Sequence, residues 1–282
     1  MKRILVPCDF SSRSREAYKT AMHWASLTGG EVIALYVNFI PAVYDFSFTG
    51  ETLAFNPEYL SSMEQDAKTE FEKMKQEANF SSVQSRLEIV YGDVVFSIKN
   101  FVESNKMNMI IMGTSGSSGL EEIFIGSNTE KVVRHSPVPV LAVREYVNVS
   151  SMKKILFPTL MNLDQAEFMK KLKELQQFLN ATLHVLFVNS PSHFLRDSDA
   201  KEAFDEFAKQ YKLENFEFHF RNYRNEEEGV IDFTATQKID LIVMATHARK
   251  GLAHLFNGSI TEDVINHITS PVWTYALKKP VT

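Results

Sequence analysis

Short apolar runs alternate with longer amphipathic segments along the whole chain. In the first half, runs of strand length lie near residues 3–7, 31–38, 85–91, 108–113 and 139–144. Segments with helical spacing of apolar residues lie between them, at about 12–28, 57–79, 93–104 and 127–135. Several runs are apolar without strict alternation, as expected for strands that helices cover on both faces. The pattern predicts an α/β fold with a doubly wound parallel sheet.

The second half repeats this pattern. Residues 1–7 (MKRILVP) align with residues 152–158 (MKKILFP) at an offset of 151, and Gly126 aligns with Gly258 at an offset of 132. The second copy is therefore shorter by 19 residues, and we expect the loss to fall in the aromatic-rich stretch 39–55. Its strands are expected near 154–158, 182–188, 216–221, 240–245 and 272–277.

A repeat of this length indicates two tandem domains rather than a solenoid. We place the domains at residues 1–146 and 152–280, and the total of 282 residues suits about two domains. Because the join is short, the two domains are expected to pack closely.

Composition and charge exclude several classes of protein. The formal net charge is -5 and neither half is basic, which argues against a nucleic-acid platform. The single cysteine, Cys8, rules out a disulfide within the chain and suits a reducing compartment. No apolar run approaches the ~20 residues of a membrane span. The chain begins directly with a strand-like segment and without a signal peptide, so we expect a cytoplasmic location.

The most specific motif is a glycine-containing stretch after the fourth run of the first half. Gly113, Gly116 and Gly126 are followed by Ser127, with the spacing G-x2-G-x9-G-S. Backbone N–H groups of such a loop, together with a helix N-terminus, can hold phosphate. The alternative is a plain strand–helix connection, and Ser127-Asn128-Thr129-Glu130 also has the form of a capping box.

The corresponding stretch of the second copy is degraded. It keeps Gly258 and Ser259 but has Ala245 and Ala248 where the first copy has Gly113 and Gly116. A Cβ at Ala248 would point to where phosphate oxygens need to lie. We therefore expect one intact site and one degenerate site.

Asp9 ends the first apolar run and is followed by Ser11 and Ser12. A carboxylate at this position can accept hydrogen bonds from a sugar or base, and the alternative is that Asp9 caps the next helix. Leu160 takes its place in the second copy and can accept nothing. Cys8 is expected to be a small, partly buried residue.

Eight histidines are present, and none has the spacing of a zinc motif. No Walker A motif, G-x-G-x-x-G or nucleophile elbow occurs either. We therefore predict no metal site and no catalytic residue.

With these motifs the chain resembles a tandem universal stress protein, and the resemblance covers nearly all of it. The first copy resembles the nucleotide-binding branch of that family through Val6–Ser11 and the spaced glycines. The resemblance implies a five-stranded sheet of order 3-2-1-4-5 in each half. It also implies that the last strands, 138–143 and 272–277, join the halves as an intramolecular pseudo-dimer.

The resemblance further implies a set of ligand-binding residues in the first copy. Adenine would lie near Pro7, Cys8, Asp9, Val37 and Met112. Ribose and phosphates would lie at Gly113, Gly116, Gly126, Ser127 and Asn128. One departure is that Glu121 and Glu122 stand in a loop that is basic in many relatives, and carboxylates there oppose a triphosphate.

Three functions follow as hypotheses. The first is a stress or signalling protein that binds ATP, ADP or AMP, with or without magnesium, in the first domain. The second is a slow ATPase or self-phosphorylating enzyme, although no general base stands beside the loop. The third is an interaction protein that has lost nucleotide binding. An unknown protein partner and a homodimer of the tandem chain are further expectations.

Overall fold

The computed structural model describes residues 2–38, 57–114, 127–247 and 268–277, and within them two similar halves. The elements of the first half are β1 (Arg3–Pro7), α1 (Ser12–Thr28), β2 (Glu31–Asn38), α2 (Pro57–Ala78), β3 (Gln84–Tyr91), α3 (Val94–Ser104), β4 (Met109–Gly113), α4 (Ser127–His135) and β5 (Val140–Val143). Those of the second half are the 3₁₀ turn η1 (Val149–Ser151), β6 (Lys154–Pro158), α5 (Ala166–Leu179), β7 (Thr182–Asn189), α6 (Asp197–Tyr211), β8 (Phe216–Asn222), α7 (Glu226–Gln237), β9 (Leu241–His247) and β10 (Val272–Leu277).

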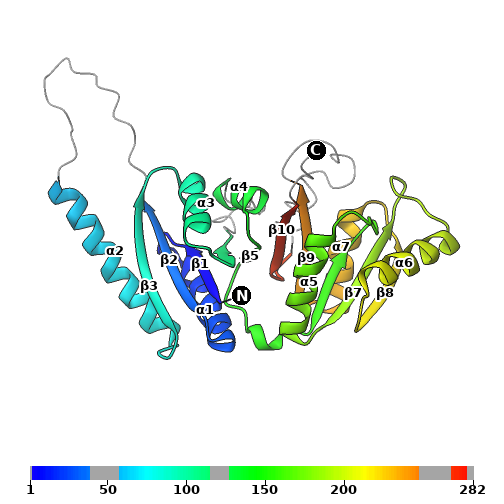
Figure 1. Cartoon of the computed structure of the whole chain (residues 1–282), viewed down its shortest axis with the longest axis horizontal. Helices are drawn as coiled ribbons and strands as arrows, with labels where there is room; N and C mark the ends of the chain where they lie inside the picture. Colours follow the sequence, from blue (N-terminus) through cyan, green and yellow to red (C-terminus); the bar gives the residue numbers. More distant parts are fainter. Residues whose placement is uncertain (1, 39–56, 115–126, 248–267, 278–282) are drawn as a thin grey trace, which may run out of the picture.

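The ten strands among the described residues belong to one sheet, in the order β3-β2-β1-β4-β5-β10-β9-β6-β7-β8. Within each half the neighbouring strands are parallel, whereas β5 and β10 pair antiparallel, with Leu141 opposite Trp273. Figure 1 shows this pair at the centre, with β3 and β8 at the outer edges. The predicted α/β class is confirmed. Each half has the strand order 3-2-1-4-5, and the expected joining of the halves through their last strands is seen as the pairing of β5 with β10, which makes the two five-stranded units one continuous sheet.

The difference in length between the halves is not confined to the stretch 39–55, which lies outside the described residues. α2 has 22 residues and its counterpart α6 has 15. The expected location of the loss was therefore incomplete, because a shorter helix accounts for part of it.

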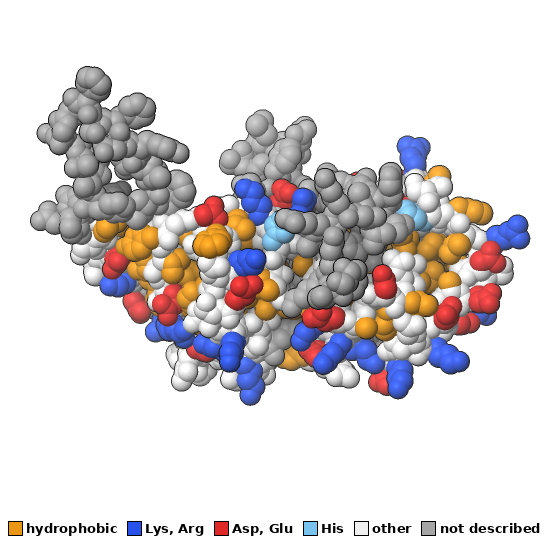
Figure 2. All heavy atoms as spheres, turned by 45° about the horizontal axis from the view of Figure 1, so that its top comes forward, with side chains coloured by type: hydrophobic (Ala, Val, Ile, Leu, Met, Phe, Trp, Pro, Cys, Tyr) orange, Lys and Arg blue, Asp and Glu red, His pale blue; other side chains and the backbone are white. Residues whose placement is uncertain are grey.

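The surface that Figure 2 shows carries Lys and Arg side chains interspersed with Asp and Glu. Ion pairs such as Arg86–Glu31, at 2.9 Å, join several of these charges. None of the described helices is long and apolar enough to cross a membrane.

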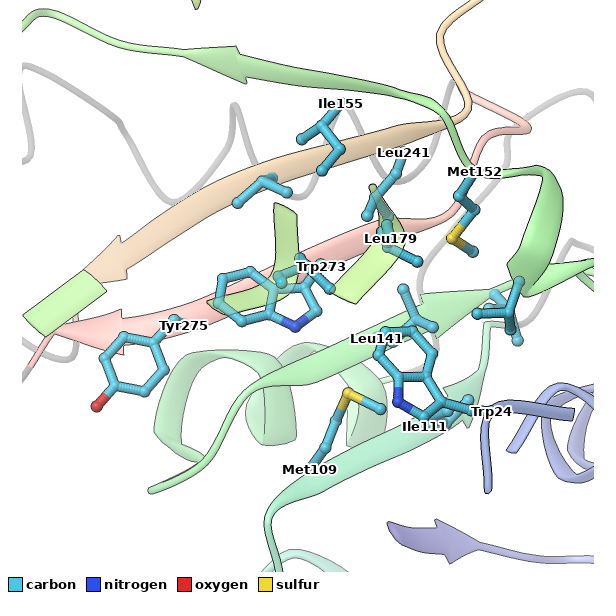
Figure 3. Close-up of a cluster of buried hydrophobic side chains, with 14 of the residues drawn as sticks. Trp24, Met109, Ile111, Leu141, Met152, Ile155, Leu179, Leu241, Trp273 and Tyr275 are labelled. Atoms are coloured by element: carbon cyan, nitrogen blue, oxygen red, sulfur yellow. The ribbon is translucent and has the colours of Figure 1, made fainter. Parts of the chain in front are cut away.

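The two faces of the sheet bury two hydrophobic clusters, and each cluster contains residues of both halves. The first cluster lies under α1, α2, α5 and α6, and the second under α3, α4 and α7. In the first cluster, Trp24 of α1 stacks on Phe178 of α5 with ring centroids 4.9 Å apart. Figure 3 shows Trp24, Leu141 and Trp273 gathered there with residues of both halves. The halves thus share their core.

The repeat also holds at the level of single backbone conformations. Phe10 and Met161, which are equivalent at the offset of 151, both have positive φ, of 61° and 60°. Gly29 and Asn180, equivalent in the same way, both end a helix in the left-handed conformation. The left-handed residue after the first strand and the left-handed cap of the following helix are therefore common to both halves, although the side chains differ.

Candidate functional site

The candidate site lies beside β1, where the order of the strands in the first half reverses. From β1 the chain first continues to β2 on one side, and later returns to β4 on the other side. In open α/β sheets, ligands bind outside the carboxyl ends of the strands at such a switch point. Here those ends are Pro7 of β1 and Gly113 of β4.

Three of the predicted adenine-binding residues lie on one face of the sheet, the face covered by α3 and α4. Met112 is buried in the second cluster and Val37 packs against it, half-buried. Pro7 lies two residues beyond Leu5 of the same cluster and is also half-buried, and alternate strand residues share a face. Together these side chains offer an apolar surface beside the switch point.

Cys8 lies on the opposite face. Its Sγ contacts Ser14 Oγ at 3.7 Å and Met74 Sδ at 3.9 Å, inside the first cluster. Its N–H donates to the carbonyl of Leu35 at 2.9 Å. Burial raises the pKa of the thiol, so it is neutral at physiological pH. Any contact of Cys8 with a ligand would therefore come from its backbone and not from its thiol.

Asp9 is exposed, directly after β1. Its Oδ1 accepts from the hydroxyl of Ser11 at 2.6 Å and from the N–H of Ser11 at 3.0 Å. Partial burial raises the pKa of Asp9, but these hydrogen bonds outweigh it and hold the pKa below the usual value. The N-cap of α1 is Ser11, which accepts from the N–H of Ser14, so Asp9 does not cap this helix directly. Its ionised carboxylate is held in place and faces solvent.

Packing against α1 requires glycine at position 113, and the sequence did not reveal this requirement. A Cβ at this position would lie 2.6 Å from the carbonyl oxygen of Arg13 and 2.7 Å from its carbonyl carbon. Only glycine lets the first turn of α1 approach the end of β4 this closely. The residue therefore fixes the distance between α1 and β4 at the mouth of the candidate site.

The first turn of α4 is tied to the same place. The hydroxyl of Thr129, which is buried, donates to the carbonyl of Gly113 at 3.3 Å. The N-terminus of α4, at Ser127, consequently lies beside the carboxyl end of β4, with Asn128 exposed. Thr129 was missed at the level of the sequence, because the motif was interpreted as a capping box.

Two of the predicted phosphate-binding residues, Gly116 and Gly126, lie outside the described residues, as does the side chain of Ser127. The structure thus brings together Pro7, Val37, Met112, Gly113 and the start of α4, with Asp9 following β1.

The equivalent place in the second half is filled differently. Thr159 replaces Cys8, is buried, and accepts from the N–H of Met161 at 2.9 Å. Leu160 replaces Asp9 and packs against the first cluster. Described residues of β6, β9, β10 and the turn after β6 line a hollow of about 20 Å³ there, room for about one water molecule. The position equivalent to Asp9 therefore carries no carboxylate, and the hollow beside it is too small for a nucleotide.

The comparisons with known proteins agree for both halves. The sequence model described as the universal stress protein family matches residues 1–144 and 152–275. Universal stress protein MJ0531 of Methanocaldococcus jannaschii is 32% identical over 145 residues, covering 51% of this chain and 82% of its own length. Universal stress protein Slr1230 of Synechocystis sp. is 24% identical over 98% of this chain and 100% of its own length.

Among solved structures, a universal stress protein from Archaeoglobus fulgidus is similar over nearly the whole fold. The TM-score is 0.74, with 19% sequence identity, and the similarity covers 96% of this chain and 97% of that one. At this identity the similarity supports the fold of both halves together.

Proposed function

The chain belongs to the universal stress protein family, and on that premise we propose that its first half binds an adenine nucleotide, either ATP, ADP or AMP. The second half is the built-in partner and has a degenerate site. We further propose a stress or signalling role in the cytoplasm, with no fast turnover of the nucleotide.

One observation carries this proposal: Asp9, Gly113 and the first turn of α4 come together at the carboxyl ends of two adjacent strands. Adenine would rest on the half-buried face beside Pro7, Val37 and Met112. The carboxylate of Asp9 would accept hydrogen bonds from the ribose hydroxyls, since both of its hydrogen bonds to Ser11 end on Oδ1. A carboxylate has about four lone-pair sites, so it can accept further hydrogen bonds from a ligand.

The phosphates would lie toward the N-terminus of α4. Helix N-termini favour anions because of their free N–H groups and the helix dipole. The spaced glycines Gly116 and Gly126, with Ser127 and Asn128, would complete this part of the site, and magnesium would offset the charge of Glu121 and Glu122. This part of the proposal rests on the sequence and on the place where α4 begins.

Mass spectrometry of the purified protein, first native and then denatured, tests the proposal. We expect one adenine nucleotide per chain, or one equivalent bound when ATP is titrated with magnesium. Two nucleotides per chain would contradict a degenerate second site. No binding under either condition would favour the interaction protein, and turnover above a matched blank would favour the enzyme.

Matched variants then locate the site. Gly126→Val should abolish binding, because a side chain blocks the approach of the backbone to phosphate, while Gly258→Val should leave affinity unchanged. Asp9→Ala should weaken binding without unfolding the protein. Equal losses of nucleotide affinity in the two glycine variants would contradict the proposal that only the first half binds a nucleotide.

A further inference from the structure

We propose that His184, Glu217 and His219 form a binding site for a divalent transition-metal ion, for which zinc is the best match. The site lies in the second half, away from the switch point, on the outer strands β7 and β8. It is independent of nucleotide binding.

The register of the sheet brings these residues together. β7 and β8 are parallel, with His184 opposite Glu217 and Leu186 opposite His219. Residues 184 and 186, and likewise 217 and 219, share a face because strand side chains alternate. The three polar side chains therefore point to the same side of the sheet, the side covered by α7, as the contacts of both rings with Phe233 show.

The three ligand atoms form a nearly regular triangle. Nδ1 of His184 lies 3.1 Å from Nε2 of His219. Oε2 of Glu217 lies 3.5 Å from the first nitrogen and 3.6 Å from the second. Tetrahedral zinc holds nitrogen and oxygen ligands at about 2.0–2.1 Å, which separates the ligands by roughly 3.3 Å. An ion can thus lie near the centre of this triangle with little movement of the side chains.

The chemistry of the three groups also suits a cation. Imidazole binds zinc through a neutral ring nitrogen. Burial is the main cause that lowers the pKa of both His184 and His219. Without a metal, one of the two facing nitrogens must carry a proton and donate it to the other. With a metal, both nitrogens offer lone pairs, and Glu217 adds a negative charge.

The surroundings fix the rings and leave one side open. Phe233 lies against His219 with ring centroids 4.7 Å apart, and the two imidazoles stack at 5.3 Å. The side chain of Glu217 is 59% exposed, so water can reach the ion and complete four-coordination. The nearby cations Lys154 and Arg221 are engaged with the carbonyl groups of Gln237 and Phe220.

A metal here would cross-link the edge of the sheet. β8 is the last strand of the second half and pairs only with β7 among the described strands. An ion bound by His184 on one strand and by Glu217 and His219 on the other would hold the edge strand in register. Binding to the folded protein alone raises its stability by mass action.

Zinc titration of the metal-stripped full chain tests the site, with a chromogenic chelator as competitor at neutral pH. We expect one zinc site that His219→Gln weakens by about tenfold or more, because losing a ligand costs at least as much as losing a group that only supports one. Glu217→Gln, an exposed change, should weaken binding less. The control His193→Gln alters a histidine of the same half that pairs with Glu226 at 2.6 Å and should bind zinc as the parent does.

A second measurement guards against a variant that fails to fold. In imidazole NMR spectra of the unaltered chain, zinc should shift the resonances of His184 and His219 and leave that of His23 in place. Affinity should fall as the solution is made more acidic, because protons compete with the metal for the rings. Unchanged affinity in both His219→Gln and Glu217→Gln, no zinc binding by the parent chain, or NMR shifts confined to other histidines would overturn the proposal.

Discussion

The turns after β1 and β6 share one left-handed residue but differ in where the next helix begins and in their side chains. Phe10 and Met161 adopt nearly the same positive φ at equivalent positions. After this turn, α1 starts at Ser12, whereas α5 starts only at Ala166, three residues later than equivalence requires. Ser11 caps α1 through its side chain, but the N-cap of α5 forms no side-chain cap hydrogen bond.

The later start of α5 explains why alanine is tolerated in the second half. Gly113 is required where the backbone of Arg13, in the first turn of α1, lies against it. The equivalent of Arg13 is Asp164, which precedes α5, and Ala245 stands in place of Gly113. The glycine and the early helix start occur together in the first half, and neither occurs in the second. The difference teaches that the two switch points differ in their backbone scaffold as well as in the side chains that follow the first strand.

The largest expected change in stability tests whether the two halves unfold together as one cooperative unit. Trp24→Ala removes a fully buried side chain that stacks on Phe178 of the other half, and should lower the free energy of unfolding by about 3–5 kcal/mol. The chain has two tryptophans, so Trp273 then reports alone on the second half in urea unfolding. Its fluorescence transition should shift together with the loss of circular dichroism.

The control for this variant is Phe96→Ala, because Phe96 is 65% exposed and its loss should change stability little. If the Trp273 transition stayed where it is while the circular dichroism split into two steps, the two halves would be independent units.

A smaller effect is expected at the end of β4. Gly113→Ala places a methyl group against the backbone of Arg13 and should destabilise the protein by about 1–3 kcal/mol. Chemical denaturation measures this change. The reverse change in the other half, Ala245→Gly, should cost at most about 1 kcal/mol, since it only loosens the strand. Equal costs for the two variants would mean that the helix start does not decide which residue is tolerated.

The cap of α1 provides the next comparison. Ser11→Ala removes the oxygen that accepts from the N–H of Ser14 and the hydroxyl that donates to Asp9. It should cost about 1 kcal/mol in thermal or chemical unfolding. Ser12→Ala, at the neighbouring exposed residue, is the matched control and should be close to neutral. A loss as large at Ser12 would show that the cap is not the cause.

The smallest effect concerns pH. The pKa of Asp9 is lower in the folded protein than its usual value, so its ionised form stabilises the fold above about pH 4, and this contribution is lost as the pH falls below it. Asp9→Asn should therefore flatten the dependence of stability on pH in the acid range. Denaturation series at several pH values measure the slope. A slope that does not change would mean that Asp9 titrates alike in the folded and unfolded chain.

Much of the fold follows from the sequence, because both halves repeat the same apolar runs. The bounds of β1, β2, α1 and α4 are those expected from the hydrophobic pattern. The junction was predicted from the family resemblance and not from the hydrophobic pattern, because the pairing of β5 with β10 joins strands that are far apart along the chain. The pattern of one half contains no information about the partner of its last strand.

The site was predictable only in part, for identifiable reasons. A glycine that admits phosphate and a glycine that admits a helix look the same in sequence, and only the distance from Gly113 to Arg13 reveals the second role. That Cys8 lies on the face opposite to Pro7 could have been inferred from alternation, since the two residues are adjacent in the sequence. The grouping of His184 with His219 depends on the register of β7 and β8, because a slip of one residue would reverse the face.

Because β5 and β10 belong to one chain, the association of the two halves through this pair is independent of dilution. Separate subunits that meet through such edges must find each other, and they come apart when the protein is scarce. Here a short connection through Val149–Ser151 holds the second half next to the first. Its effective local concentration does not change with the level of expression. A substitution at the switch point of the second half therefore leaves this association in place, as long as β10 continues to supply the neighbouring strand.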